Sequence, residues 1–497
     1  MPALFVSAYD LHNHPLLKES HETRKSYLSA LQLVLRPIGL SPSGKELLRQ
    51  YYQHLLDDEK KPSIWPNESY ALSTALQSLP VTKVPYLIFL LLYDAARFVD
   101  DISSLVKLNT VFASLALPVS PLIPLTTYLS LANNVLTNCL GPEAGTLYQE
   151  YLKNRSFCKA EEHKIVVTAT VSADKSTLIN ALTGKRLARV ASEVCTGAIC
   201  HIYNKLFEDG RIHLADGDSF NFDISEKELT QTSRTSSFSL ASYFQFCTEN
   251  TERLCLIDTP GVDPVGHDQH LDMTRDCLRA EQDETIVCVL EPTKLDTNAT
   301  WVHIKWMGKN LRKENIVFVV NKIDNLNPEE DDREACLARL KNGLLQLGWT
   351  DPVICPVSAY FAFLLKRREK GFPLSEEELD DYDYFVRKFS KPQHNLTFHY
   401  EGQSSSQTDS EFIRLSKACG MYGLEQVLLN RTNGQRQQEA CPAHCTQKGD
   451  FPQKTEKSTV PARGRKALLT GCRTRPAKDW RSRQKRTKKS PFPRSAS

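Results

Sequence analysis

Residues 165–182, with the sequence IVVTATVSADKSTLINAL, decide the fold of this chain. The β-branched run Ile165–Thr168 predicts a strand, and the apolar spacing that begins after Lys175 predicts a helix. The loop between them has the spacing of the phosphate-binding pattern G-x-x-x-x-G-K-[ST], although Ala169 and Asp174 stand where that pattern has glycine. A strand, a phosphate loop and a helix in this order predict an α/β fold.

The same loop predicts phosphate contacts. In an intact loop of this type, backbone N–H groups surround the phosphates, the lysine reaches the β- and γ-phosphates, and the hydroxyl ligates Mg²⁺. Lys175 and Ser176 have the spacing for the last two roles. We expect the backbone amides of Ala173, Asp174 and Thr177 to complete the phosphate cradle.

The two replaced glycines predict weak binding. Ala169 adds one methyl group where the backbone approaches the phosphates, which is a modest obstruction. Asp174 adds a carboxylate beside the β-phosphate position. Two like charges about 4 Å apart repel by about 4 kcal/mol at an effective dielectric constant near 20. That energy lowers an affinity roughly a thousandfold, and Mg²⁺ would recover part of it if the carboxylate turned toward the metal.

Residues 253–261, RLCLIDTPG, form a second apolar run that ends in polar residues. An aspartate at the end of a strand can hold Mg²⁺ directly or through a water, and a glycine three residues later can offer its amide to a γ-phosphate. We expect Asp258 and Gly261 to take these two roles.

Residues 315–324, NIVFVVNKID, combine an apolar strand with a possible base-recognition motif. The Asp324 carboxylate can accept hydrogen bonds from the ring N–H and amino groups of guanine, which adenine does not present in the same way. Asn321 and Lys322 belong to the same motif, so we include all three residues among the nucleotide contacts.

Residues 353–359, VICPVSA, predict one more strand, and a backbone N–H at Ser358 or Ala359 can meet the guanine carbonyl. A D-x-x-G or S-A motif is weak alone, N-K-I-D at the end of an apolar strand is much stronger, and the order of the motifs is informative. Because open α/β sheets bind ligands at the carboxyl ends of their strands, the four stretches together predict one guanine-nucleotide pocket.

These stretches resemble a known family. The sequences KSTLINALTG (175–184), LIDTPGVDP (256–264) and VVNKID (319–324) are similar to the large GTPases of the dynamin type, especially the bacterial dynamin-like proteins, over about 161–391. The resemblance implies a P-loop GTPase domain that uses GTP and Mg²⁺.

The resemblance also implies roles for two more residues and for partners. Thr196 lies in a stretch similar to the first switch of the family, which closes on Mg²⁺ and the γ-phosphate, and Ser172 matches a residue that positions the attacking water. In this family, dimerisation across the nucleotide face assists hydrolysis, and the cycle moves a stalk on a membrane. We therefore expect a homodimer and a cytoplasmic protein, with peripheral contact at the inner membrane as an option.

Two function classes remain open at this stage. One is a GTPase that hydrolyses GTP to GDP and phosphate slowly because of Ala169 and Asp174. The other is a pseudo-GTPase that keeps the fold as a protein- or membrane-interaction module without turnover. A third class, nucleic-acid binding, is expected only through the basic carboxy-terminal segment.

Charge divides the chain. The last 67 residues contain 18 Lys and Arg and 4 Asp and Glu, whereas the first 430 contain 44 and 55. We predict a helical neck- or stalk-like region at 1–158, a GTPase domain at 159–395, a linker and returning helix at 396–430, and a basic, disordered tail at 431–497. The short helical segment after the GTPase domain leaves a truncated gene product or a change of reading frame near residue 430 as alternatives.

Apolar stretches raise the question of membrane spans. Residues 108–142 carry no charged side chain, but Pro118, Pro121 and Pro124 divide them into pieces too short to span. We expect two buried helices joined by a proline-rich turn there, and a core helix at 84–93. A hairpin is expected around Asp209-Gly210.

Overall fold

In the computed structural model the chain divides into residues 1–441 and 442–497, and every described residue lies in the first of these units. The described residues are 3–56, 84–99, 104, 106–108, 110–111, 142–170, 173–188, 198–231, 237–247, 251–261, 268–326, 332–400 and 409–439. Ser172, Thr196, the predicted proline-rich turn and the basic segment after residue 439 lie outside them. The predictions for those parts therefore stay predictions.

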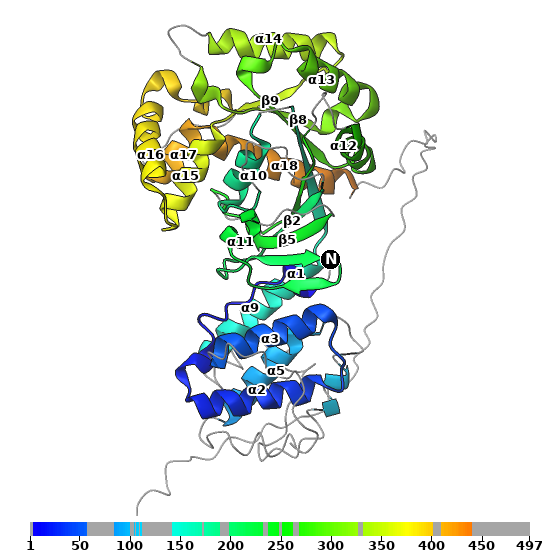
Figure 1. Cartoon of the computed structure of the whole chain (residues 1–497), viewed down its shortest axis with the longest axis vertical. Helices are drawn as coiled ribbons and strands as arrows, with labels where there is room; N and C mark the ends of the chain where they lie inside the picture. The colour runs from blue at the N-terminus through cyan, green and yellow to red at the C-terminus, as the bar shows by residue number, and fades with distance from the viewer. Residues whose placement is uncertain are drawn as a thin grey trace, which may run out of the picture. The chain divides into compact units, whose positions relative to one another are not determined.

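A nine-stranded sheet forms the centre of the fold, in the order β4-β3-β5-β2-β6-β1-β7-β8-β9 (Figure 1). Five neighbouring strands run parallel to one another: β6 (Arg253–Asp258), β1 (Glu162–Ala169), β7 (Thr285–Leu290), β8 (Ile316–Val320) and β9 (Val353–Pro356). These strands are almost wholly buried, as expected for a parallel sheet covered on both faces. The predicted α/β fold with a mostly parallel sheet is confirmed.

The remaining strands correct one prediction. They are β2 (Cys200–Lys205), β3 (His213–Asp216), β4 (Ser219–Asn221) and β5 (Phe238–Tyr243). No hairpin forms around Asp209-Gly210, because β5 lies between β2 and β3 in the sheet. The Asp209 carboxylate instead accepts from Lys205 Nζ and from the backbone N–H of Tyr9. The hairpin joins β3 to β4 around Gly217, where φ is +57°.

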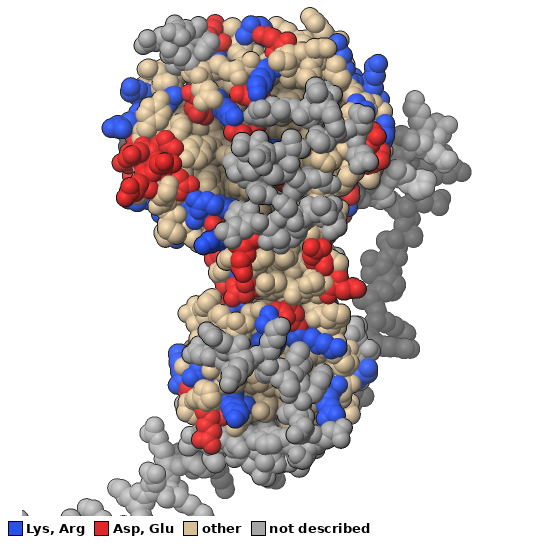
Figure 2. Space-filling view, viewed as in Figure 1, with Lys and Arg blue, Asp and Glu red and all other residues tan. Residues whose placement is uncertain are grey.

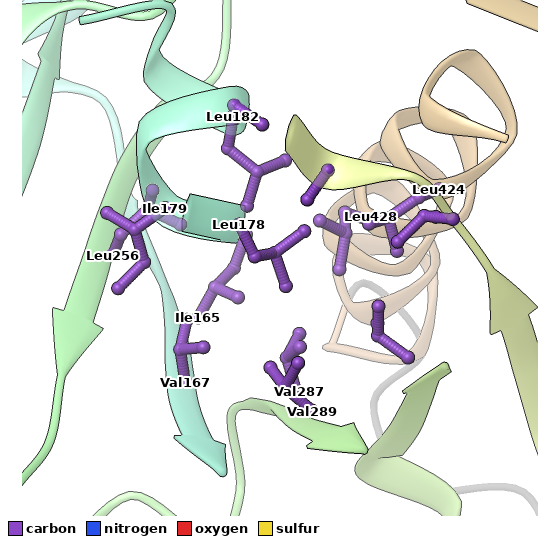
Figure 3. Close-up of a cluster of buried hydrophobic side chains, with 14 of the residues drawn as sticks. Ile165, Val167, Leu178, Ile179, Leu182, Leu256, Val287, Val289, Leu424 and Leu428 are labelled. Atoms are coloured by element: carbon purple, nitrogen blue, oxygen red, sulfur yellow. The ribbon is translucent and has the colours of Figure 1, made fainter. Parts of the chain in front are cut away.

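Helices flank the sheet. They are α10 (Lys175–Thr183), α11 (Glu226–Gln231), α12 (Asp268–Ala280), α13 (Asn298–Asn310), α14 (Arg333–Gln346), α15 (Ala359–Glu369) and α16 (Glu376–Phe389). Short 3₁₀ turns connect them: η2 (Pro292–Lys294), η3 (Lys313–Asn315), η4 (Ile323–Asn325), η5 (Pro392–His394) and η6 (Thr397–His399). Figure 3 shows the core where α10 meets the sheet, with Leu178 and Leu182 in one buried cluster with Val287 and Val289 of β7. Burial of this apolar surface fixes α10 against the strands that carry the candidate site.

Helix α16 carries the densest acidic surface in Figure 2. Glu376, Glu377 and Glu378 occupy its first turn, where the helix dipole favours negative charge. Ser375 and Glu378 form a capping box, and Glu378 also accepts from Arg186 at 2.5 Å. The acidic run at the start of α16 is therefore accounted for by the capping box and by the favourable interaction of negative charge with the helix dipole.

The amino-terminal helices are α1 (Ala3–Val6), η1 (Pro15–Lys18), α2 (His21–Leu35), α3 (Pro42–Leu56), α5 (Val84–Arg97) and α9 (Pro142–Lys159). Their core surrounds the fully buried Asp94, whose carboxylate accepts hydrogen bonds from Tyr27, Tyr51 and His14. Helix α5 lies in that core, as predicted for 84–93. Within the described residues, every helix is too short or too polar to cross a bilayer.

The returning helix predicted within 396–430 is two helices, α17 (Glu411–Ala418) and α18 (Met421–Glu439). Gly420 separates them with φ of +81°, and a Cβ there would come within 2.2 Å of the Pro356 carbonyl oxygen. Helix α18 continues past the predicted limit at residue 430. Its residues Leu424 and Leu428 pack near Leu178 (Figure 3).

Buried cysteines complete the core of the sheet. Cys255, Cys288 and Cys355 are free thiols on β6, β7 and β9, and each is at most 1% exposed. A buried cysteine of this kind acts as a small apolar core residue. Their burial raises the pKa of each thiol.

Candidate functional site

Asp174 begins α10 in a left-handed backbone conformation, with φ of 55° and ψ of 51°. Glycine adopts this conformation without cost, whereas a residue with a Cβ is destabilised by roughly 1 kcal/mol. The glycine of the phosphate-loop pattern is therefore replaced at a position where the backbone itself favours glycine. The expectation for Asp174 from the sequence concerned only the negative charge of its carboxylate. The pattern's second glycine was the signal for the backbone requirement.

The Asp174 side chain points to the base-recognition motif. Its Oδ2 lies 2.8 Å from Lys322 Nζ, and it makes no capping hydrogen bond to the start of α10. Lys322 also has a positive φ, of 59°. The added carboxylate is therefore paired with a cation rather than isolated in the phosphate cradle.

Lys175 contacts the second predicted motif directly. Its ammonium donates to Asp258 Oδ1, which ends β6. Burial lowers the pKa of Lys175 from 10.5 to about 7, while a carboxylate in contact opposes this shift because it stabilises the charged ammonium. The phosphate-loop lysine and the candidate Mg²⁺ ligand thus lie together, as the spacing predicted.

Asn321, at the end of β8, joins three of the motifs. Its Nδ2 donates to the carbonyl of Ala173 at 3.1 Å, and its Oδ1 accepts from the N–H of Ala359 at 3.0 Å. Asn321 is 1% exposed. The Ala359 amide, expected to meet a guanine carbonyl, therefore donates to Asn321 in this structure.

Asp324 is a half-buried carboxylate of the site. Burial raises its pKa, whereas the Ser358 hydroxyl, a backbone amide and the ammonium groups of Lys388 and Lys322 act in the opposite direction. Lys388 Nζ also donates to the Asp324 carbonyl at 2.7 Å. An ionised carboxylate held in a protected position is what recognition of the guanine N–H groups requires.

We call Asn321, Asp324, Ser358 and Ala359 the base half of the pocket, and residues 173–177 with Asp258 the phosphate half. The two halves meet at the carboxyl ends of β1, β6, β8 and β9. Comparison with known proteins bears on this arrangement. Residues 165–323 match the model of the dynamin family.

The match covers about a third of the chain, and over these residues the domain is similar to the dynamin family. The matched residues extend from β1 to the base-recognition motif, so they include the whole phosphate half of the pocket but, of the base half, only Asn321. The expected relation to dynamin-type large GTPases is confirmed.

Solved structures with similar chains include two described as an oligomerised bacterial dynamin pair that provides a mechanism for long-range sensing and tethering of membranes. Each is 14% identical to this chain, with TM-scores of 0.32 and 0.31. The matches cover 85% and 86% of this chain but 64% and 75% of those chains. A search of curated proteins found no match.

The candidate site offers oxygen ligands that suit Mg²⁺. Ser176 and Asp258 supply a hydroxyl and a carboxylate, and Mg²⁺ commonly binds through one or two protein oxygens together with waters and substrate phosphates. Among the described residues, no cluster of three or more His, Cys, Asp or Glu forms a metal site made of protein alone. The donor set therefore fits a metal held jointly with a nucleotide.

The remaining predicted residues lie at the same edge of the sheet. Thr177 is buried in the first turn of α10, and Gly261 follows β6, where space remains around its Cα. The Thr259 hydroxyl donates to the Val167 carbonyl at 2.9 Å, which fixes the end of β6 to β1. Lys388 was missed by the sequence analysis, because it comes from α16, outside every motif.

Proposed function

We propose that residues 159–395 form a domain that binds guanine nucleotide with Mg²⁺ and hydrolyses GTP to GDP and phosphate slowly. The observation that supports this most strongly is the position of Asn321, which is bonded to both the phosphate loop and the Ser358-Ala359 turn. Three segments distant in sequence are thereby held as one pocket.

Residues of the chain divide the work in this proposal. Asp324 accepts from the guanine N–H groups, Lys175 neutralises the β- and γ-phosphates, and the amides at the start of α10 hold phosphate oxygens. Mg²⁺, when bound, neutralises the charge of the phosphates. Because phosphoryl transfer depends mainly on positioning and charge, these residues need no covalent step.

Five further residues complete the proposal. Ser176 and Asp258 ligate the metal, and the Gly261 amide contacts the γ-phosphate. By resemblance to the family, Thr196 closes on Mg²⁺ and Ser172 orients the attacking water.

Slow turnover follows from the phosphate half. The full repulsion of about 4 kcal/mol would apply to an unpaired carboxylate, but Asp174 is paired with Lys322. We therefore expect an affinity penalty nearer tenfold than a thousandfold. The strained backbone at Asp174 adds to the cost of holding the cradle in shape.

The rival proposal, a pseudo-GTPase that serves as an interaction module, is favoured by one observation. Lys175 already donates to Asp258, so a phosphate and a metal must separate this pair in order to bind. If that exchange is unfavourable, the fold persists without turnover.

Titration with fluorescent GDP and GTP, with and without Mg²⁺, tests the two proposals. Wild type and Asp174→Gly are compared, and GTP hydrolysis is measured under the same conditions. We expect wild type to bind about tenfold more weakly than Asp174→Gly and to hydrolyse GTP slowly. Lys175→Ala should abolish hydrolysis. Binding by Asp174→Gly alone would establish the pseudo-GTPase.

Assembly and location are proposed from the family relation alone. We propose a cytoplasmic protein that dimerises through its nucleotide face and contacts the inner membrane peripherally. Light scattering with GTP and Mg²⁺, and sedimentation with anionic vesicles, test these two interactions. Any binding to DNA should disappear when residues 431–497 are deleted.

A further inference from the structure

The Asp174–Lys322 ion pair joins the two halves of the pocket through a contact absent from the phosphate-loop pattern. Each residue has positive φ and immediately precedes a helical turn, and the charged groups of the two side chains lie 2.8 Å apart. The adjacent bond from Asn321 Nδ2 to the Ala173 carbonyl keeps the two turns side by side.

The direction of the Asp174 carboxylate is unusual for its position. An aspartate at the start of a helix ordinarily accepts from the N–H of the second or third helical residue. Asp174 makes no such bond, and its Oδ2 lies 2.8 Å from Lys322 Nζ. Lys175 meanwhile contacts Asp258. The two lysines therefore form ion pairs with different carboxylates: Lys175 with Asp258, and Lys322 with Asp174.

We propose that Lys322 is a positioning residue for the phosphate half. Its ammonium turns the Asp174 carboxylate away from the phosphate cradle and neutralises it, so that the chain tolerates an acidic residue where the pattern has glycine. This inference rests on the proposed nucleotide binding, and it concerns the diphosphate group of a guanine nucleotide.

A double-mutant cycle with fluorescent GDP and Mg²⁺ tests the proposal. Its members are wild type, Lys322→Gln, Asp174→Asn and the double variant. In wild type, Lys322→Gln exposes the phosphates to an unpaired carboxylate, so we expect at least about a tenfold loss of affinity. In the Asp174→Asn background the same change should cost less than about threefold. The double variant should therefore bind more tightly than Lys322→Gln alone.

Two controls separate this role from a structural one. Lys322→Arg keeps the charge and should retain affinity within about threefold of wild type. Because the side chains of the pair are 40% and 26% exposed, the melting temperature of Lys322→Gln should stay within about 2 °C of wild type. A larger drop, with no rescue by Asp174→Asn, would mean that Lys322 only supports the fold.

The outcomes distinguish this inference from the proposed function. If Lys322→Gln lowers affinity equally in both backgrounds, Lys322 acts on the nucleotide independently of Asp174, and the inference is overturned while the function stands. If neither wild type nor Asp174→Gly binds GDP, the proposed function is overturned as well.

Discussion

The base half and the phosphate half of the pocket differ in how completely their motifs are preserved. In the base half, Asn321 is buried with both ends of its amide hydrogen-bonded, and Asp324 is a half-buried carboxylate next to Ser358. In the phosphate half, Asp174 occupies a left-handed position and turns toward Lys322. The comparison teaches that a nucleotide pocket can lose a glycine in one half while the hydrogen bonds of the other remain.

The largest effect is expected on guanine-nucleotide affinity when Asp324, the hydrogen-bond acceptor of the base half, is replaced. Asp324→Asn replaces a carboxylate that accepts two hydrogen bonds with an amide that also donates. Guanine affinity should fall roughly 10⁴-fold, because buried polar groups are left unpaired, and xanthine nucleotides should bind better than guanine nucleotides. Competition titrations measure this, with the exposed Asp276→Asn as the matched control. Unchanged guanine affinity would show that Asp324 does not face the base.

The phosphate half depends on α10, which is anchored at its far end. Lys366 Nζ donates to the Ala181 carbonyl at 2.6 Å and pairs with Glu425 of α18, and both side chains are at most 2% exposed. Lys366→Met leaves a buried unpaired carboxylate, so the free energy of unfolding should fall by about 4 kcal/mol.

Chemical denaturation measures the loss at Lys366. The control is Lys18→Met, which breaks an exposed pair with Glu143 and should cost under about 1 kcal/mol. Equal losses in the two variants would mean that the buried pair does not anchor α10.

The order of the motifs let the sequence predict the sheet and the pocket edge. The apolar runs before Asp258 and Asn321 end where strands end, and parallel strands bring such ends together. The parallel pairing of β2 with β5 was not predictable from the sequence. The paired residues Cys200 and Phe238 are 38 positions apart in the chain. Long-range pairing leaves no local signal comparable to a turn motif.

Single contacts from other elements were also beyond the motifs. Lys388 reaches Asp324 from α16, and the break between α17 and α18 depends on contact of Gly420 with Pro356. The left-handed backbone at Asp174 could have been inferred from the phosphate-loop pattern. Asp174 replaces a glycine, and glycine is the residue that adopts positive φ without a steric cost.

Protonation of a buried histidine behind the phosphate loop should make stability depend on pH. His303 on α13 is 3% exposed and lies 3.3 Å from the Thr168 hydroxyl of β1. Burial, with the nearby Arg275 charge, lowers the pKa of His303 from 6.5 to about 4. The unfolded chain therefore binds the proton first as the pH falls. Stability from this group is full above about pH 6.5 and is lost between pH 6.5 and 4, by about 3 kcal/mol.

Urea unfolding at several pH values measures this dependence. His303→Gln should flatten the slope between pH 6.5 and 4, whereas the exposed His21→Gln should leave it unchanged. The same slope in wild type and His303→Gln would assign the effect to other groups.

The smallest effect is expected on the free energy of unfolding. It comes from two substitutions of Asp174 that separate the backbone conformation of this residue from its charge. Asp174→Gly and Asp174→Ala both remove the carboxylate, but only glycine adopts positive φ freely. The glycine variant should be more stable than the alanine variant by about 1 kcal/mol. Lys341, which is exposed within α14, is the control position. There the alanine variant should be more stable than the glycine variant by about 1 kcal/mol. If alanine is the more stable residue at both positions, Asp174 does not hold a left-handed conformation.

Calorimetric titration of the wild-type protein with GDP and with ADP, both with Mg²⁺, tests the central claim most directly. If the base half selects guanine despite the altered phosphate half, GDP should bind at least about 100-fold more tightly than ADP. Equal affinities for the two nucleotides, or no binding of GDP at millimolar concentration, would contradict the account.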